Sequence, residues 1–266
     1  RYFLTNRYDK MTELQDKISR SLRQFARRHR VASGAGVRFR AALIDMDGTL
    51  YDSMGHHTLA WHRMMHDIGI DTDRDRFYLY EGMTGKATVN LLFREYLHRD
   101  ATDEEVAEHY HRKTVYFNEM PAVSPMPGAG ELLSYLRRCG VTCVLVTGSG
   151  QRSLIDRLER DFPGIFTPEL MITSADVEHG KPHPEPYVKA MVRAGVTPQE
   201  AFVIENAPLG VRAGAASGAF TIGLTTGPVP VEVLAGEGAD IVLPSMQALA
   251  DNIATLLGDG TDAADK

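Results

Sequence analysis

The feature of this sequence that most restricts its fold is a regular alternation of short apolar segments with longer amphipathic ones. The apolar segments of strand length are residues 41–46, 142–147, 170–173, 201–205, 220–224 and 241–243. The segments with helical periodicity are residues 129–139, 151–161, 184–193, 209–217 and 246–257. Buried strands that alternate with helices predict a parallel sheet covered by helices on both faces. The expected fold class is therefore α/β, a doubly wound Rossmann-like sheet, with any ligand site at the carboxyl ends of its strands.

One part of the chain departs from this alternation. Residues 54–125 contain helical runs at 57–68, 88–98 and 104–118 and no clear strand. Proline and glycine in the PMPG segment that begins at Pro125 suit a hinge-like connection at the far boundary. We therefore expect an inserted α-helical cap domain at residues 54–125. The core would then consist of residues 37–53 and 126–266.

The first 36 residues form a basic extension and linker. They hold nine Lys or Arg against three Asp or Glu, a net charge of +6. A helical apolar stripe runs through them at Leu14, Ile18, Leu22 and Phe25. Thr12 and Gln15 predict a capping box at the start of this helix. Residues 1–10 are left out of the fold prediction. Residues 33–36 (SGAG) predict a flexible linker. Packing of the helix on the core is the favoured interpretation; self-association and contact with a membrane surface or an anionic partner are the alternatives.

Composition excludes several classes of protein. The chain is 43% hydrophobic and 24% charged, as is typical of globular proteins. It has neither a run of about 20 apolar residues nor a signal-peptide core, so we expect a cytoplasmic protein with no membrane partner. The whole chain carries −6, which leaves −12 beyond residue 36 and argues against a nucleic-acid partner. Cys139 and Cys143 alone predict neither a disulfide framework nor a zinc site, and the oligomeric state stays open.

The strongest chemical signal is the DMDGTL segment that begins at Asp45, directly after the first apolar strand. It places Asp45 and Asp47 two residues apart at the end of a buried strand. Buried carboxylates are costly unless a partner or a metal compensates their charge. The pair suits phosphoryl transfer, in which Asp45 attacks phosphorus and Asp47 supplies protons. Mg²⁺ would neutralise the carboxylate and phosphate charges that otherwise repel each other.

The ends of three later strands carry groups that such chemistry needs. The predicted phosphate binders after the second strand are Thr147, Gly148 and Ser149, at the expected start of a helix. Lys181 follows the third strand and suits pairing with an aspartate and phosphoryl oxygens. Glu205 and Asn206 end the fourth strand with the hard oxygen ligands that Mg²⁺ prefers.

In order and in position at strand ends, these residues resemble the four motifs of the haloacid dehalogenase-like superfamily of phosphotransferases, over roughly residues 40–257. The resemblance implies that Asp45 is the nucleophile that forms an aspartyl-phosphate. It implies that Asp47 is the general acid for the leaving group and then the base for water, and that Thr147 and Lys181 hold the transferring phosphoryl group. The implied Mg²⁺ ligands are Asp45, the backbone carbonyl of Asp47, Asn206 and, directly or through another ligand, Glu205.

The position of the helical insertion between the first two motifs is similar to the C1 cap type of β-phosphoglucomutase and its relatives. His57 and Trp61 stand where that group carries a His and an aromatic residue, and we expect His57 to help position Asp47. True β-phosphoglucomutases have an arginine in the cap loop that grips the second phosphate of the substrate. Here the loop reads GMTG from Gly82, and Lys86 is the nearest replacement for that arginine.

Glu81 stands directly before this loop, where a carboxylate would repel phosphate unless a cation lies between them. We therefore expect Glu81 to ligate the core Mg²⁺ from the cap side. Together with Asn206, where the family more often has Asp, this resembles a β-phosphoglucomutase-like clade that includes inorganic pyrophosphatases. The main prediction is Mg²⁺-dependent hydrolysis of inorganic pyrophosphate. The alternatives are a hexose-phosphate phosphatase or β-phosphoglucomutase and, from a different class, a non-catalytic binding or scaffold protein.

Overall fold

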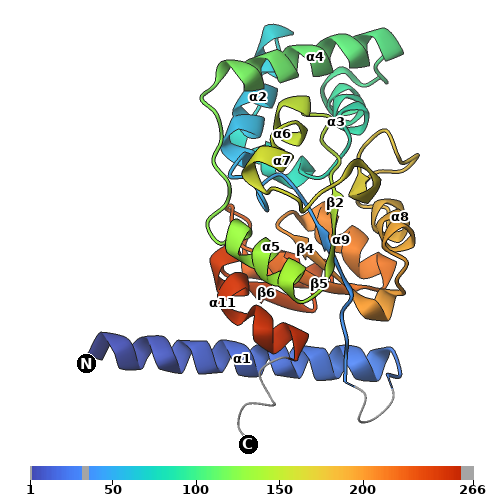
Figure 1. The fold of residues 1–266 in the computed structure, drawn as a ribbon. Coiled ribbons are helices and arrows are strands. Elements are labelled where there is room, and N and C mark those ends of the chain that lie inside the picture. The colour runs from blue at the N-terminus through green and yellow to red at the C-terminus, as the bar shows by residue number, and fades with distance from the viewer. Residues whose placement is uncertain (1, 32–35, 259–266) are drawn as a thin grey trace, which may run out of the picture.

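The computed structural model describes residues 2–31 and 36–258, which form a six-stranded parallel sheet with helices on both faces (Figure 1). The strand order is β3-β2-β1-β4-β5-β6. The strands are β1 (Ala41–Ile44), β2 (Thr142–Val146), β3 (Met171–Ile172), β4 (Ala201–Glu205), β5 (Phe220–Leu224) and β6 (Ile241–Leu243). The predicted α/β class and doubly wound parallel sheet are confirmed. β1 ends two residues earlier than the apolar run suggested, so Asp45 lies just past the sheet, where its backbone N–H donates to the carbonyl of Ile204.

Two layers of helices cover the sheet. The core helices are α5 (Ala129–Arg138), α6 (Arg152–Ile155), α7 (Leu158–Asp161), α8 (Glu185–Ala194), α9 (Pro208–Ser217), α10 (Val231–Gly236) and α11 (Met246–Leu257). Successive side chains of a strand point to opposite faces. In β1, Ala42 and Ile44 therefore join the apolar cluster under α5 and α11, while Ala41 and Leu43 join the cluster under α8 and α9.

One helical prediction in the core was wrong, and one short helix was missed. The segment 151–161 forms α6 and α7 instead of one helix, because the N–H of Arg157 bonds the carbonyl of Leu154 three residues back and interrupts the helical ladder. The six-residue helix α10 was not predicted, since a segment that short carries too little periodicity to be recognised.

The insertion between β1 and β2 is all helical, as expected. It consists of α2 (Met54–Asp67), η1 (Arg74–Tyr80), α3 (Gly85–Leu92), η2 (Phe93–Leu97) and α4 (Asp103–Glu119). Apolar side chains from these elements, among them Trp61, Met64 and Phe77, form a hydrophobic cluster of their own. Figure 1 shows α2, α3 and α4 at one end of the sheet, beyond the carboxyl ends of its strands, and α1 at the opposite end.

The N-terminal helix α1 (Tyr2–Arg28) packs on the core beside α11 and β6. The predicted capping box was wrong: the helix starts ten residues before Thr12, whose backbone is therefore helical instead of the extended form that a cap needs. Ile18 and Phe25 are fully buried, and the ring of Phe25 meets that of Phe220 edge to face at 5.3 Å, so docking on the core is confirmed. The predicted linker lies outside the described residues except for Gly36. None of the helices described here has the length and apolarity to cross a bilayer.

Candidate active site

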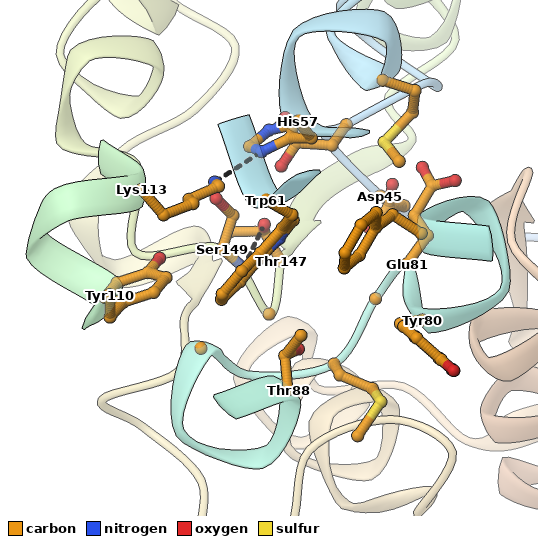
Figure 2. A pocket seen from close by; sticks show the side chains of 17 residues that line it. Asp45, His57, Trp61, Tyr80, Glu81, Thr88, Tyr110, Lys113, Thr147 and Ser149 are labelled. Atoms are coloured by element: carbon orange, nitrogen blue, oxygen red, sulfur yellow. Dashed lines mark hydrogen bonds and ion pairs between the residues drawn. The ribbon is translucent and has the colours of Figure 1, made fainter. Parts of the chain in front are cut away.

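Seven of the residues expected to carry chemistry line a pocket of about 50 Å³ between the carboxyl ends of the strands and the helical insertion, and Lys86, Lys181, Glu205 and Asn206 lie outside its lining (Figure 2). The core contributes Asp45, Asp47, Thr147, Gly148 and Ser149 to its lining. The insertion contributes Met54, His57, Trp61, Phe77, Tyr80, Glu81, Gly82, Met83, Gly85, Thr88, Tyr110 and Lys113. Ligand pockets for drug-sized molecules usually measure roughly 300–1,000 Å³. This pocket therefore has little free volume in this conformation.

Asp45 and Lys181 form a buried ion pair at the centre of the site. Lys181 Nζ donates to Asp45 Oδ1 at 2.6 Å, to Glu205 Oε1 at 2.6 Å and to the carbonyl of Val146 at 3.0 Å. Burial opposes the charge of Lys181, but the carboxylates of Asp45 and Glu205 prevail and raise its pKa above the usual value. The lysine is thus a fixed positive charge that holds one oxygen of Asp45.

Glu205 holds Lys181 in place. Its Oε1 accepts hydrogen bonds from Lys181 and from the hydroxyl of Tyr187 at 2.8 Å, and its Oε2 accepts the N–H groups of Asn206 and Ala207. Both oxygens are engaged by the protein in this way, so in this conformation Glu205 positions the lysine; its role at Mg²⁺, direct or through another ligand, stays a prediction. Tyr187, which the sequence analysis did not single out, is part of this arrangement.

A chain of hydrogen bonds runs from the insertion to Asp47. Lys113 Nζ lies 2.6 Å from Nδ1 of His57, whose Nε2 lies 2.8 Å from Oδ1 of Asp47. Ser53 Oγ donates to the same oxygen at 2.7 Å. A lysine ammonium can only donate, so we assign the tautomer of His57 that accepts at Nδ1 and donates at Nε2. The structure thus places His57 where it orients Asp47.

The charges of Asp47, His57 and Lys113, which these hydrogen bonds link, follow from the burial of each group and from its neighbours. Burial opposes the charge of Asp47, but His57, Ser53 and Lys113 together lower its pKa to about 2. Burial lowers the pKa of His57, with Lys113 adding to the effect and Asp47 opposing it. Burial likewise lowers the pKa of Lys113 to about 8, against the attraction of Asp47. The resting site therefore holds an ionised Asp47 beside a neutral imidazole.

Lys113 is a pocket residue that sequence reasoning missed. It belongs to α4, its side chain is buried, and its ammonium lies 5.4 Å from the centre of the Trp61 ring (Figure 2). The signal in the sequence is its spacing: Tyr110, Lys113 and Phe117 share one face of α4 at i, i+3 and i+7, so a lysine stands on an apolar helix face. Lys86, the predicted substrate-binding cation, instead pairs with Asp103 at the surface, where 67% of its side chain is exposed. That placement corrects the expectation for Lys86.

The loop after β2 lies against the insertion. A Cβ at Gly148 would come within 2.3 Å of the carbonyl oxygen of Gly82, so only glycine allows this close approach. Thr147 Oγ1 accepts the N–H of Ser149 at 3.0 Å, and the hydroxyl of Tyr110 accepts the N–H of Gly150 at 2.8 Å. The N–H groups of Ser149 and Gly150 are engaged within the protein in this conformation. The expected helix start at these residues was wrong, because α6 has four residues and begins only at Arg152; phosphate binding by this loop stays a prediction.

Glu81 reaches the core from the insertion. It follows η1, is buried, and its Oε1 accepts a hydrogen bond from Nδ2 of Asn206 at 2.8 Å. Gly48 makes room for this contact: a Cβ there would lie 2.1 Å from the Asn206 amide and 2.9 Å from Glu81 Oε1. Burial raises the pKa of Glu81 well above its usual value, with the charge of Asp45 as the next cause. Glu81 therefore lies beside the carboxylates of the core, as expected.

The donor set fits a divalent cation. Among the described residues, the buried carboxylates gathered here are those of Asp45, Asp47, Glu81 and Glu205, and the buried ammonium groups are those of Lys113 and Lys181. Ionised together, they leave two uncompensated negative charges. Burial, followed by the charge of Glu205, raises the pKa of Asp45 to about 8 against the attraction of Lys181. A hard cation held by oxygen atoms would stabilise the charged forms of Asp45 and Glu81.

The family of this chain follows from comparison with known proteins. A profile described as haloacid dehalogenase-like hydrolase matches residues 39–218, which include Asp45, Asp47, Thr147, Lys181 and Asn206. The chain belongs to the haloacid dehalogenase-like hydrolases.

Individual relatives carry names of phosphatases and mutases. Hexitol phosphatase A of Escherichia coli is 28% identical over 80% of this chain and 94% of its own length. Validoxylamine A 7'-phosphate phosphatase of Streptomyces hygroscopicus is 32% identical over 71% of this chain and 86% of its own length. A solved structure named as a presumed β-phosphoglucomutase from Bacteroides vulgatus is 43% identical, with a TM-score of 0.86 over 92% of this chain and 98% of the other. The resemblance to the β-phosphoglucomutase-like clade is thereby confirmed.

Proposed function

We propose that this chain is a Mg²⁺-dependent phosphohydrolase that works through an aspartyl-phosphate on Asp45. A carboxylate oxygen of Asp45 attacks phosphorus, and the bond between phosphorus and the leaving oxygen breaks. Lys181 holds Asp45 for this attack, and Thr147 and Lys181 bind the transferring phosphoryl oxygens. The observation that carries the proposal is the buried Asp45–Lys181 pair at the carboxyl end of the sheet, directly beside Asp47. A non-catalytic scaffold would have no use for so costly a group of buried charges.

Asp47 moves the protons in both steps. An incoming phosphate adds negative charge near Asp47 and raises its pKa, which favours the protonated form that donates to the leaving oxygen. The resulting carboxylate then takes a proton from the water that attacks the aspartyl-phosphate. His57 and Lys113 keep its Oδ1 in place through this cycle. Residues 54–125, acting as a cap, therefore carry part of the acid and base machinery.

We propose that Mg²⁺ is held by Asp45, the backbone carbonyl of Asp47, Asn206 and Glu81. When bound, the ion neutralises phosphate and carboxylate charge and polarises the phosphorus–oxygen bonds. Glu205 is not included in this set, since its Oε1 already accepts hydrogen bonds from Lys181 and Tyr187.

Inorganic pyrophosphate is the substrate that the geometry of the site favours. The Glu81 carboxylate closes over the core beside Asn206 and leaves a pocket of about 50 Å³. A compact and highly charged substrate that arrives with a cation suits such a pocket better than a sugar does. Lys86 lies at the surface, so the pocket also lacks the cation that was the candidate for binding a second, more distant phosphate.

Phosphorylated carbohydrates are the second candidate, and the relatives favour them. The relatives reported above are named as a hexitol phosphatase, a validoxylamine A 7'-phosphate phosphatase and a β-phosphoglucomutase, and none of those names mentions pyrophosphate. Trp61, Phe77 and Tyr110 provide an aromatic wall to the pocket. Aromatic faces of this kind pack well against the apolar face of a sugar ring. A more open position of the insertion would be needed to admit such a substrate.

The deciding experiment measures phosphate release from pyrophosphate with Mg²⁺ beside hexose 6-phosphates, a hexitol phosphate and β-glucose 1-phosphate at matched concentrations. We expect pyrophosphate to lead in kcat/KM by tenfold or more, about 1.4 kcal/mol of transition-state preference. A sugar or hexitol phosphate in the lead would overturn pyrophosphate in favour of the second candidate. No release from any compound, with Mg²⁺ present and the protein folded, would overturn the phosphohydrolase itself.

A further inference from the structure

A second group of metal-ligating side chains lies outside the active site. Among the described residues, His179, His183 and Glu185 offer ligand atoms that all lie within 4.8 Å of one another. His179 and His183 belong to the loop between β3 and α8, and Glu185 is the first residue of α8. The proposed hydrolysis uses none of these three side chains, although Lys181 stands between them in the sequence. The proposed hydrolysis therefore does not explain why these three side chains lie close together.

The spacing of the group suits zinc. Zinc in proteins is bound by four ligands in tetrahedral geometry at about 2.0–2.1 Å, which places neighbouring ligand atoms roughly 3.3 Å apart. Nδ1 of His179 and Oε2 of Glu185 already lie 3.3 Å apart. The ring of His183 lies 4.9 Å from that of His179, centre to centre. His183 is exposed, and a rotation of its side chain brings a ring nitrogen to the other two ligands in place of its hydrogen bond with the N–H of Glu185.

The carboxylate of Glu185 is held in place before any ion binds. It accepts the N–H groups of Glu178 and His179 at 3.0 and 2.9 Å, and Lys189 Nζ lies 2.7 Å from Oε1. These contacts, led by Lys189, keep its pKa at about 2. Glu185 is therefore an ionised ligand whose Oε2 is turned toward His179. Pre-positioning of this kind lowers the entropy cost of binding.

We propose that His179, His183 and Glu185 form a surface site for Zn²⁺ or a similar divalent transition-metal ion, with water as the fourth ligand. Two imidazoles and one carboxylate favour such an ion over Mg²⁺, which prefers oxygen ligands throughout. The site is thus distinct in position and in metal preference from the one at Asp45. A bound ion joins both ends of the segment that carries Lys181, so it stabilises that segment against local unfolding.

The test uses the untagged full-length chain with Mg²⁺ in large excess, and measures Zn²⁺ uptake by equilibrium dialysis. We expect wild type to bind one Zn²⁺ more per chain than His179→Gln or His183→Gln. The matched control is His111→Gln, an exposed histidine on α4 that should leave uptake unchanged. Zinc that occupies the Asp45 site contributes equally to all four proteins, so the difference isolates the new site.

Two further readouts make the result decisive. Each variant should keep the Mg²⁺-dependent hydrolysis of wild type in the absence of zinc, which shows that it is folded. Cobalt(II) in place of zinc should give wild type the visible absorption of a tetrahedral complex, and His183→Gln should lose it. Equal zinc uptake by wild type and His183→Gln, or the same cobalt spectrum in both, would overturn the proposal.

Discussion

Oε1 of Glu81 lies 2.8 Å from Nδ2 of Asn206, and this contact joins the helical insertion to the end of β4. The two residues are 125 positions apart in the chain, and each departs from what the resemblance to β-phosphoglucomutases leads one to expect. Asn206 has one negative charge fewer than an aspartate, and Glu81 adds one at the same place. Their proximity keeps the charge of the proposed magnesium site constant while it places one of the negative charges on the insertion instead of the core.

We expect Glu81→Ala to reduce pyrophosphate hydrolysis at least tenfold more than hydrolysis of a small aryl phosphate, because the aryl ester depends less on closure of the insertion over a cation. The measurement is kcat/KM for both substrates at saturating Mg²⁺. The control is Glu104→Ala, which removes an exposed carboxylate from the same insertion. Equal losses on the two substrates would remove the specificity role of Glu81.

We expect Asp45→Asn to lower turnover by roughly 10³-fold or more, because an amide cannot form the covalent intermediate. The fold should persist, because Lys181 keeps Glu205 and the carbonyl of Val146 as partners. Phosphate release and a thermal melt followed by circular dichroism check both parts. Substantial activity in a folded variant would refute Asp45 as the nucleophile.

We expect kcat/KM to fall as pH rises through about 8. Burial lowers the pKa of Lys113 to about 8, so above this pH Lys113 loses the positive charge that stabilises ionised Asp47, and its hydrogen bond to His57 weakens. Stability should change in the opposite direction. An unfolded lysine has a pKa of about 10.4, so between about pH 8 and 10.4 the unfolded chain binds more protons than the folded one. The contribution of Lys113 to the free energy of unfolding therefore rises with pH in this range.

Lys113→Met tests whether Lys113 causes the decline of kcat/KM near pH 8. It should lower kcat/KM by about 10–100-fold at pH 7 and remove the decline near pH 8, while the protein stays folded because a buried charge has been replaced by an apolar side chain of similar length. Lys86→Met is the control, and its pH profile should match wild type since Lys86 lies at the surface. A decline near pH 8 that persists in Lys113→Met would assign it to another group.

Much of the fold was predictable because the strands are buried on both faces. Residues 201–205, 220–224 and 241–243 appear in the sequence as apolar runs, and β4, β5 and β6 occupy the same residues. The meeting of Asp45 and Lys181 was predictable for a related reason: parallel strands bring their carboxyl ends to one edge of the sheet, so groups far apart in the chain converge there.

The remaining features depend on tertiary contacts that no local pattern encodes. Glu205 has the chemistry of a metal ligand, yet Lys181 and Tyr187 occupy its Oε1. Lys113 is a cation on an apolar helix face, and only the packing of α4 against α2 brings it to His57. Lys86 stands beside the cap loop in sequence but faces solvent from the first turn of α3, where it pairs with Asp103.

The N-terminal helix should be an integral part of the folded core. Phe25 is fully buried and its ring contacts Phe220 of β5, so Phe25→Ala should lower the free energy of unfolding by about 3–5 kcal/mol. Arg23→Ala, on an exposed position of the same helix, should change it by no more than about 0.5 kcal/mol. Urea unfolding followed by circular dichroism measures both variants. A Phe25→Ala protein as stable as wild type would mean that α1 unfolds independently and that its contact with β5 adds nothing to the stability of the sheet.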